Sequence, residues 1–269
     1  MSIKLIATDL DGTFLDDHSQ FDRDRLAKVL PALREKGIQF VAASGRAIAS
    51  LEKEFAGFED QMIFLGENGT VVRSKDKIYY EEIMSRDLYL TIIQKIIDSH
   101  FQNVDTIHAS GKKGAYALKT IGPEYLAFME HYYPQLMLVD DFENIDDEIY
   151  KVGANFVPEE LKAAAEWITE TIPGVVSVTS GFECLDVMLD HVDKGNGLSH
   201  LCDALGISAD QVLAFGDNFN DVGMLQFAGT AVVPENAHPE IKALADEIIG
   251  DHDTGAVMAY MEEIACQSN

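Results

Sequence analysis

The segment Asp9-Leu10-Asp11-Gly12-Thr13 decides the fold class, because it directly follows a short apolar run at residues 3–8. A short apolar run that stops at polar residues is typical of a buried strand in a parallel sheet, and ligands of such sheets bind just beyond the carboxyl ends of the strands. Asp9 and Asp11 can converge on one point if the loop bends at Gly12. Carboxylates placed together need a cation, and their hard oxygens suit Mg²⁺.

Two other interpretations of this segment are an EF-hand-like Ca²⁺ loop and a turn without chemistry. An EF-hand-like Ca²⁺ loop starting at Asp9 would need glycine at position 14 and glutamate at position 20, where the chain has Phe14 and Gln20. That motif is therefore not matched. A turn rich in aspartate and without chemistry stays open on this segment alone.

The pattern of the neighbouring residues predicts an α/β fold. Short apolar runs alternate with longer stretches of helical period, as in parallel strands joined by crossover helices. We expect strands at 3–8, 38–43, 62–65 and 212–215, and helices at 22–36, 47–56 and 195–205. Pro31 is expected to kink the first of these helices. The prediction is a Rossmann-like, doubly wound parallel sheet.

Residues 83–190 have a different pattern. Helical stretches at 87–99, 123–133 and 158–171 alternate with short strands at 116–119, 152–157, 175–178 and 184–189. We interpret this segment as a separate α/β module inserted into a discontinuous core of residues 1–82 and 191–269. Within it, residues 140–148 hold six carboxylates and no base, which indicates a solvated surface rather than a metal site.

The charge and the cysteines limit the classes of partner. The 269 residues include 46 Asp and Glu against 20 Lys and Arg, so the net charge is −26, and 47% of the residues are apolar. Such an apolar fraction predicts a folded chain. Nucleic acid and anionic membranes are excluded as expected partners, because both are bound by clusters of Lys and Arg. Three cysteines without C-x-x-C spacing, and no apolar run near about 18 residues, lead us to expect a reduced, cytoplasmic protein. The oligomeric state has no signal in the sequence.

A second aspartate-rich segment, Gly216-Asp217-Asn218-Phe219-Asn220-Asp221, follows the strand expected at 212–215 and opens a helix. Asp217 is expected to be a third oxygen ligand, with Asn220 or Asp221 orienting a bound group. Helix capping alone is the alternative for these residue types.

Two further segments indicate an anion. Ser44-Gly45-Arg46 ends a predicted strand, and a hydroxyl followed by glycine at a helix start favours phosphate, although a plain strand-to-helix turn is an even alternative. Lys194 opens a predicted helix, where a cation opposes the helix dipole. We therefore expect an anionic neighbour for Lys194, against the alternative of a solvated surface lysine.

These segments, in this order, resemble the four motifs of the haloacid dehalogenase superfamily: Asp9-x-Asp11-Gly12-Thr13, Ser44, Lys194, and Gly216-Asp217-x-x-Asn220-Asp221. The form Ser44-Gly45-Arg46, the turn Gly66-Glu67-Asn68-Gly69 and the inserted module make the whole chain similar to the Cof-type (subfamily IIB) sugar-phosphatase branch, whose insert is an α/β cap. One departure is Ala231-Val232-Val233-Pro234-Glu235-Asn236-Ala237, where that branch more often has Gly-Val-Ala-Met-Gly-Asn-Ala. This departure bears on substrate fit more than on chemistry.

The resemblance implies a Mg²⁺-dependent phosphatase that acts on small phosphomonoesters through an aspartyl-phosphate. Asp9 would be the nucleophile and Asp11 the general acid and base. Mg²⁺ would be held by Asp9, the backbone carbonyl of Asp11, and Asp217. The residues expected to bind the phosphoryl group are Leu10 and Gly45 through their N–H groups, Ser44, Lys194 and Asn220, with Arg46 and Asp221 in supporting places. Arg46 is alternatively a structural ion-pair partner.

Other functions stay open at this level. A phosphomutase would use the same phosphoenzyme and pass the group to another alcohol. A non-catalytic phosphometabolite-binding module is a third reading, disfavoured because all four motif acids and bases are present. A nucleotide-dependent dehydrogenase would need G-x-G-x-x-G after the first strand, and the chain has none there.

The cap is expected to close over the site and contribute specificity. Lys112-Lys113 at a hairpin tip is either a substrate contact or a solvated turn.

Overall fold

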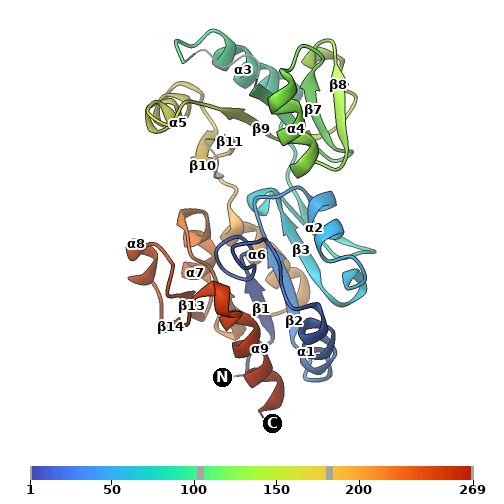
Figure 1. Cartoon of the computed structure of the whole chain (residues 1–269), viewed down its shortest axis with the longest axis vertical. Helices are drawn as coiled ribbons and strands as arrows, with labels where there is room; N and C mark the ends of the chain where they lie inside the picture. The colour runs from blue at the N-terminus through green and yellow to red at the C-terminus, as the bar shows by residue number, and fades with distance from the viewer. Residues whose placement is uncertain (1, 102–105, 180–183, 268–269) are drawn as a thin grey trace. The chain divides into compact units, whose positions relative to one another are not determined.

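The structure is a computed structural model that describes residues 2–101, 106–179 and 184–267. The chain divides into two compact units (Figure 1). One comprises Met1–Glu81 together with Asp193–Asn269, and the other comprises Glu82–Val192. We refer to them as the core unit and the cap unit.

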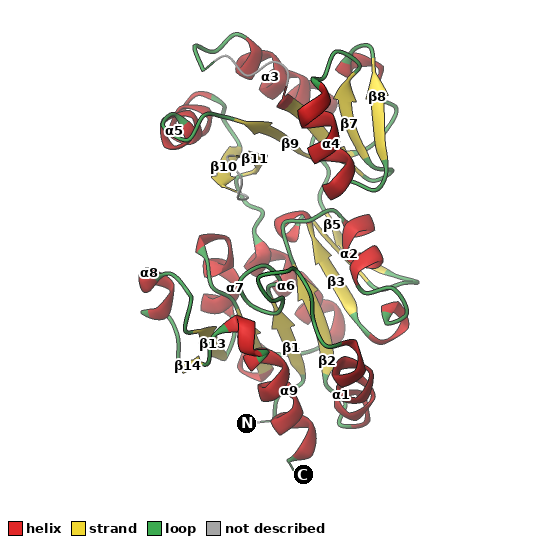
Figure 2. Ribbon diagram, in the orientation of Figure 1, coloured by secondary structure: helices red, strands yellow, loops and turns green. Residues whose placement is uncertain are grey.

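The core unit is built on a mostly parallel sheet (Figure 2). Within the described residues its spatial order is β14 (Glu247–Ile249), β13 (Thr230–Pro234), β12 (Val212–Phe215), β1 (Leu5–Thr8), β2 (Gln39–Ala43), β3 (Ile63–Gly66), β4 (Val71–Arg73) and β5 (Ile78–Glu81). All neighbours from β14 to β3 pair in parallel, whereas β4 and β5 form an antiparallel edge. Strands β2 and β3 are added in sequence on one side of β1, and β12, β13 and β14 are added in sequence on the other side. The order therefore reverses between β1 and β12, which is where open α/β sheets bind ligands.

Helices cover both faces of this sheet because alternate strand residues point to opposite sides. Ile6 packs in one apolar cluster with α1 (Arg23–Glu35), α2 (Ile48–Glu54) and α9 (Ala256–Cys266). Leu5 and Ala7 pack in another with α6 (Lys194–Leu205), α7 (Val222–Phe227) and α8 (Pro239–Lys242). The predicted doubly wound α/β core is confirmed.

The cap unit contains a second, mixed sheet. Its order in the described residues is β10 (Val175–Thr179), β11 (Cys184–Leu189), β9 (Ile149–Asn155), β6 (Ile107–Gly111), β7 (Ala115–Leu118) and β8 (Leu136–Val139). Helices α3 (Arg86–Ile97) and α5 (Leu161–Thr171) pack on one face in a continuous apolar cluster. The helix α4 (Pro123–Tyr132) connects β7 to β8, which pair in parallel. The inserted α/β module is confirmed as part of the fold.

The structure corrects some predicted elements. Strands β4, β5, β6, β8, β13 and β14 were not predicted, because they are short and five of the six lack a fully buried pattern. The helix α1 runs through Pro31 as one element. The helix α2 begins at Ile48 rather than at residue 47, and it has only seven residues.

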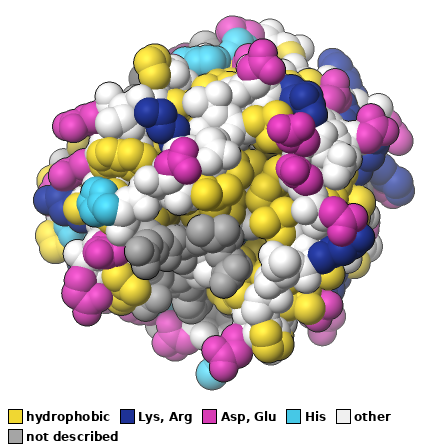
Figure 3. Space-filling view, turned by 90° about the horizontal axis from the view of Figure 1, so that it is seen from above, with side chains coloured by type: hydrophobic (Ala, Val, Ile, Leu, Met, Phe, Trp, Pro, Cys, Tyr) yellow, Lys and Arg dark blue, Asp and Glu magenta, His cyan; other side chains and the backbone are white. Residues whose placement is uncertain are grey.

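The helices and one face of the surface bear on whether the chain has a membrane span or a single charged patch. No helix among the described residues combines the length and the apolar character needed to cross a bilayer. Figure 3 shows one face of the molecule, on which acidic side chains are spread among basic and apolar ones. The net charge of −26 is thus not collected into a single patch on this face.

Candidate active site

Parallel pairing brings the predicted motif residues to one edge of the core sheet. Thr8, the last residue of β1, lies opposite Phe215 of β12 and Ala42 of β2. The next residues of the three strands therefore emerge side by side. The backbone N–H of Asp9 donates to the carbonyl of Phe215 at 2.9 Å, which continues the pairing into the loop.

Lys194 lies at the centre of this edge and is 0% exposed. Its Nζ donates to Asp9 Oδ1 at 2.5 Å and to Asp221 Oδ1 at 2.7 Å. Burial lowers the pKa of Lys194, but the carboxylates of Asp221 and Asp9 raise it by more, so that the ammonium stays charged. The alternative of a solvated lysine is wrong, and the expected anionic neighbours are these two carboxylates.

A close approach of two helices places Lys194 beside Asp221. A Cβ on Gly195, in the first turn of α6, would lie 2.3 Å from the backbone carbonyl oxygen of Gly223 in α7. Only glycine allows the two backbones this separation. Lys194 precedes Gly195 and Asp221 precedes α7, so this packing sets the distance between the two charges.

Three carboxylates surround the lysine in the core. One oxygen from each of Asp9, Asp217 and Asp221 lies within 4.8 Å of the other two. Burial raises the pKa of Asp9 well above its ordinary value, and Asp221 raises it further, against the opposite effect of Lys194. Burial and Asp221 also raise the pKa of Asp217. The group therefore carries more negative charge than one lysine balances, and its hard oxygen donors fit a divalent cation such as Mg²⁺.

Asp221 and Asp217 are held by several hydrogen bonds. Asp221 Oδ2 accepts from the N–H groups of Asp217 and Asn218 at 3.0 and 3.1 Å, while its Oδ1 faces Lys194. Thr13 Oγ1 donates to Asp217 Oδ1 at 2.8 Å. Asp221 thus orders the loop and the lysine, and both of its carboxylate oxygens are occupied by these hydrogen bonds.

Gly12 lets the first motif loop pass over Asp217. Its φ of +82° is disfavoured for residues with a side chain, and a Cβ there would lie 2.7 Å from Asp217 Oδ2. Asn236 Nδ2 donates to the carbonyl of Gly12 at 2.7 Å and fixes the turn. The asparagine retained in the divergent segment 231–237 therefore supports the motif loop, a role that the sequence analysis missed.

The side chain of Asp11 is not one of the buried carboxylates grouped around Lys194. It is 54% exposed and forms a two-point ion pair with Arg46, including Arg46 Nε to Asp11 Oδ2 at 3.0 Å. Arg46 also lies 3.6 Å from Glu54. Of the two roles predicted for Arg46, the structure shows the ion pair. The side chain of Asp11 is accordingly not a member of the carboxylate group, and its predicted part in metal binding concerns only the backbone carbonyl.

Ser44, Gly45 and Asn220 are linked by a residue that the sequence analysis left without a role. Ser44 is buried, and its carbonyl accepts from the N–H of Asn68 at 3.1 Å. Asn68 Oδ1 accepts from Asn220 Nδ2 at 3.3 Å and lies against Gly45. Asn68 has φ of +54°, which asparagine tolerates better than most residues, so the turn Gly66-Glu67-Asn68-Gly69 was the available signal.

The expectation that Ser44-Gly45 opens a helix is wrong. The helix α2 starts at Ile48 and its N-cap is Ala47, so Ser44 and Gly45 lie in the preceding loop. Leu10 is buried, and its carbonyl accepts from Thr13, Phe14 and Leu15, which makes a tight turn after Asp9. Any phosphate contact of these residues would come from loop N–H groups and not from a helix dipole.

The basic hairpin tip of the cap unit is neutralised by the acidic segment. Lys112 Nζ lies 3.2 Å from Glu148 Oε2, and Lys113 contacts Asp146 and Asp147. The segment 140–148 is therefore not simply solvated, because these lysines and Lys119, which pairs with Asp140 at 2.8 Å, share its charge. This favours the predicted alternative in which the tip has no substrate contact.

Comparison with known proteins adds to this geometry. A family model described as haloacid dehalogenase-like hydrolase matches residues 6–261. The chain is 34% identical over 265 residues to 5-amino-6-(5-phospho-D-ribitylamino)uracil phosphatase YbjI of Escherichia coli (strain K12), with 98% of this chain and 97% of that protein covered. It is 26% identical over 266 residues to HMP-PP phosphatase of Serratia proteamaculans (strain 568), covering 96% and 94%. The solved structure of SMU.1108c from Streptococcus mutans UA159 superposes with a TM-score of 0.91 at 29% identity, covering 99% of this chain and all of that one.

Proposed function

Because the chain belongs to the haloacid dehalogenase-like hydrolases, as a phosphatase of that family, we propose that it hydrolyses small phosphomonoesters with Mg²⁺ through an aspartyl-phosphate on Asp9. The observation that carries the proposal is the buried triad of Lys194, Asp9 and Asp221 beside Asp217. A carboxylate held on one oxygen by a lysine keeps its other oxygen available for attack.

The metal would be held by Asp9, the backbone carbonyl of Asp11, and Asp217. When bound, Mg²⁺ would offset the repulsion between these carboxylates and a phosphate dianion. The excess of acids over lysine, and the raised pKa values of Asp9 and Asp217, support a cation at this place. Asp221 is proposed to position Lys194 and the loop rather than to bind the metal.

In the proposed first step an oxygen of Asp9 forms a bond to phosphorus as the ester oxygen leaves. Asp11, in its protonated form, gives its proton to the leaving alcohol. In the second step Asp11 takes a proton from water, whose oxygen attacks phosphorus and releases Asp9 and inorganic phosphate. The side chain of Asp11 is half exposed, so an alcohol or water can reach the carboxyl group once it leaves the ion pair with Arg46.

Lys194, Ser44 and Asn220 are proposed to bind the phosphoryl oxygens together with the N–H groups of Leu10 and Gly45. Fixed donors of this kind stabilise the charge that develops in the transition state. The links from Ser44 through Asn68 to Asn220 support the assignment, because they hold donors from three loops in one network.

The substrate is proposed to be a small phosphometabolite. The two curated relatives are named for a ribitylaminouracil phosphate and for HMP-PP, and the ribityl compound is the first to test because that relative is more similar. A panel of sugar phosphates, that compound, FMN and pyridoxal phosphate, assayed with and without Mg²⁺, would identify the class.

The decisive variant is Asp9→Asn. It should abolish Mg²⁺-dependent phosphate release on every compound that the wild type hydrolyses, with an unchanged circular dichroism spectrum. Asp24→Asn, a change of the same size on the exposed first turn of α1, is the matched control and should keep full activity. Turnover of Asp9→Asn near the wild-type level would rule out the nucleophile.

A second measurement tests the acid and base role. Asp11→Asn should lose most of the turnover, and acid-quenched samples with ³²P-labelled substrate should still contain protein-bound phosphate if the leaving group needs no proton. Phosphorus NMR of the products separates hydrolysis from transfer to another alcohol. A second phosphomonoester as product, instead of inorganic phosphate, would overturn the hydrolase assignment in favour of a mutase.

A further inference from the structure

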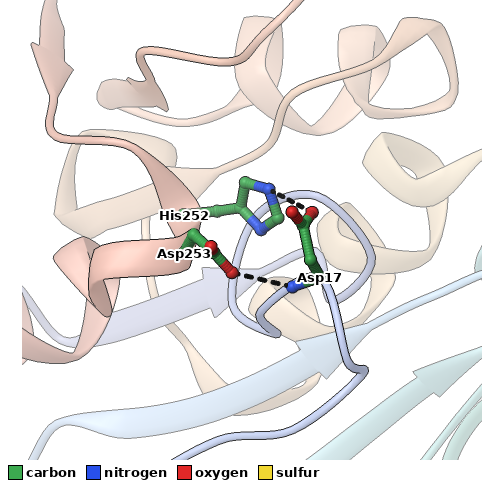
Figure 4. A group of neighbouring side chains, drawn as sticks. All are labelled: Asp17, His252 and Asp253. Atoms are coloured by element: carbon green, nitrogen blue, oxygen red, sulfur yellow. Dashed lines mark hydrogen bonds and ion pairs between the residues drawn. The ribbon is translucent and has the colours of Figure 1, made fainter.

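We propose that Asp17, His252 and Asp253 form a second metal site, for a transition-metal ion such as Zn²⁺, made of different residues from the catalytic carboxylates (Figure 4). One donor atom from each side chain lies within 4.8 Å of the other two. The group comes from two segments at opposite ends of the chain, the loop after the first motif and the turn before α9.

The loop that carries Asp17 is ordered by its own hydrogen bonds. Asp16 Oδ1 accepts from the N–H groups of His18 and Gln20, and Asp253 Oδ1 accepts from the N–H of Asp17 at 2.9 Å. The last of these bonds joins residues 236 positions apart. A carboxylate has about four lone-pair sites, and the bond to Asp17 uses one of them. Asp253 can therefore also coordinate a metal ion.

The imidazole of His252 is oriented for coordination. Its Nδ1 lies 2.7 Å from the carbonyl oxygen of Leu15, so that this nitrogen carries the proton and donates it. In a neutral ring Nε2 then presents its lone pair, and Figure 4 shows it turned to the Asp17 carboxylate. A backbone carbonyl on the far nitrogen is the usual support of a metal-binding histidine. The ring is 11% exposed, which fixes its direction.

The separation of the donors fits an ion better than a direct bond. His252 Nε2 and Asp17 Oδ1 are 3.4 Å apart. A charge-assisted hydrogen bond would bring them to about 2.7–2.9 Å. Two ligands of one tetrahedral ion with bonds of about 2.0–2.2 Å lie about 3.3–3.5 Å apart. The pair is thus spaced as two ligands of a shared ion.

The donor set selects the class of ion. One imidazole and two carboxylates suit Zn²⁺, Co²⁺ or Ni²⁺, whereas Mg²⁺ prefers oxygen donors alone. Three protein ligands leave a position for water. An ion here would join residues 15–17 to 251–253, and the N–H of His252 donates to Asn236, which holds Gly12. The site is therefore one side chain away from the first motif loop.

Isothermal titration of the full-length protein with Zn²⁺, at saturating Mg²⁺, tests the site. We use a Cys266→Ser background, because Cys266 is an exposed thiol that would also bind Zn²⁺. Asp17→Ala, Asp253→Ala and His252→Gln should each weaken the tightest Zn²⁺ event by at least about tenfold. Co²⁺ should give the visible absorption of tetrahedral coordination in the parent and lose it in the variants.

The chain offers a matched control in His191. It lies 3.4 Å from Asp190 and 3.9 Å from Glu82, but its side chain is 57% exposed. His191→Gln should bind Zn²⁺ like the parent. Equal binding by all variants, or a loss that follows only Asp217→Asn, would overturn the proposal and place Zn²⁺ elsewhere. Because the side chain of Asp17 is 71% exposed, Asp17→Ala decides the matter even if His252→Gln unfolds.

Discussion

The core unit and the cap unit each bury one lysine against carboxylate, and the two lysines have opposite surroundings. Lys194 begins α6 and lies 2.5 and 2.7 Å from Asp9 and Asp221. Lys151, in the middle of β9, lies 2.8 Å from Asp186 of the neighbouring strand β11. Both lysines are almost fully buried, so burial alone does not distinguish them.

The neighbouring titratable groups do distinguish them. Around Lys194, burial and the other acids raise the pKa of Asp9 and Asp217, which means that negative charge is in excess. Around Lys151, burial and the lysine itself lower the pKa of His108 to about 3. A group with excess buried negative charge has a reason to bind a cation, whereas a lysine that dominates its neighbours does not. Both units contain a buried ion pair, so the ion pair alone does not identify the candidate site. What distinguishes the candidate site is its excess of buried negative charge.

The largest expected effect is on catalysis. Lys194→Met should lower kcat by about 10²-fold or more, because a fixed cation next to the reacting carboxylate is lost. Lys151→Met removes an equally buried ammonium from the cap and should leave kcat of the folded protein unchanged. Steady-state kinetics on the best compound of the panel measures both. A similar loss of kcat in the two folded variants would break the comparison.

The next effect is on stability. Lys151→Met should lower the free energy of unfolding by about 3–5 kcal/mol, because the buried carboxylate of Asp186 loses the ammonium that lies 2.8 Å from it. The double variant Lys151→Met with Asp186→Leu should recover much of that loss, since an apolar pair replaces two charges. Urea denaturation at pH 7 measures both. If the double variant recovers no free energy of unfolding, the charges of Lys151 and Asp186 contribute more to stability than an apolar pair can replace.

A smaller effect concerns pH. The unfolded chain protonates His108 below its ordinary pKa of 6.5, while the folded cap does not until about 3. His108 is held by the hydroxyls of Tyr125 and Tyr133 at 3.1 Å, and Lys151 is the charge that lowers its pKa. The contribution of His108 to the free energy of unfolding is therefore fully present above pH 6.5. It is lost as the pH falls from 6.5 toward 3, by up to about 1.4 kcal/mol per pH unit.

The variant His108→Gln keeps a polar side chain and removes this titration. Urea denaturation at pH 7 and pH 5 should show a shallower loss of stability in His108→Gln than in the wild type. Equal slopes in the two proteins would mean that His108 is protonated in the folded cap, contrary to the comparison.

The smallest effect is expected at exposed ion pairs. Lys112 and Lys113 pair with acids on the surface of the cap, and such pairs contribute about 0–1 kcal/mol. Lys112→Ala with Lys113→Ala should leave kcat/KM unchanged on every compound turned over. A fall for one compound only would restore the hairpin tip as a substrate contact.

Local sequence was sufficient for the centre of the candidate site. Asp9 and Asp217 each follow an apolar run, and parallel strands end at one edge of a sheet, so their meeting could be predicted. The direction of a side chain could not. Asp11 pairs with Arg46, which lies 35 residues away in another loop, and local sequence carries no signal for that contact. The loop before α2 is likewise held by Asn68, which comes from a third loop.

The sequence by itself determined the α/β class, the insertion of a second module and the residue types at the ends of the strands. These follow from the period of apolar residues and from local turn chemistry, which act over a few positions. Only the tertiary structure decided which charged side chains contact one another. Lys194 meets Asp9 across 185 residues, and Asp17 meets Asp253 across 236. The free energy of a buried charge depends on what surrounds it in space, and strand order and helix packing set those surroundings.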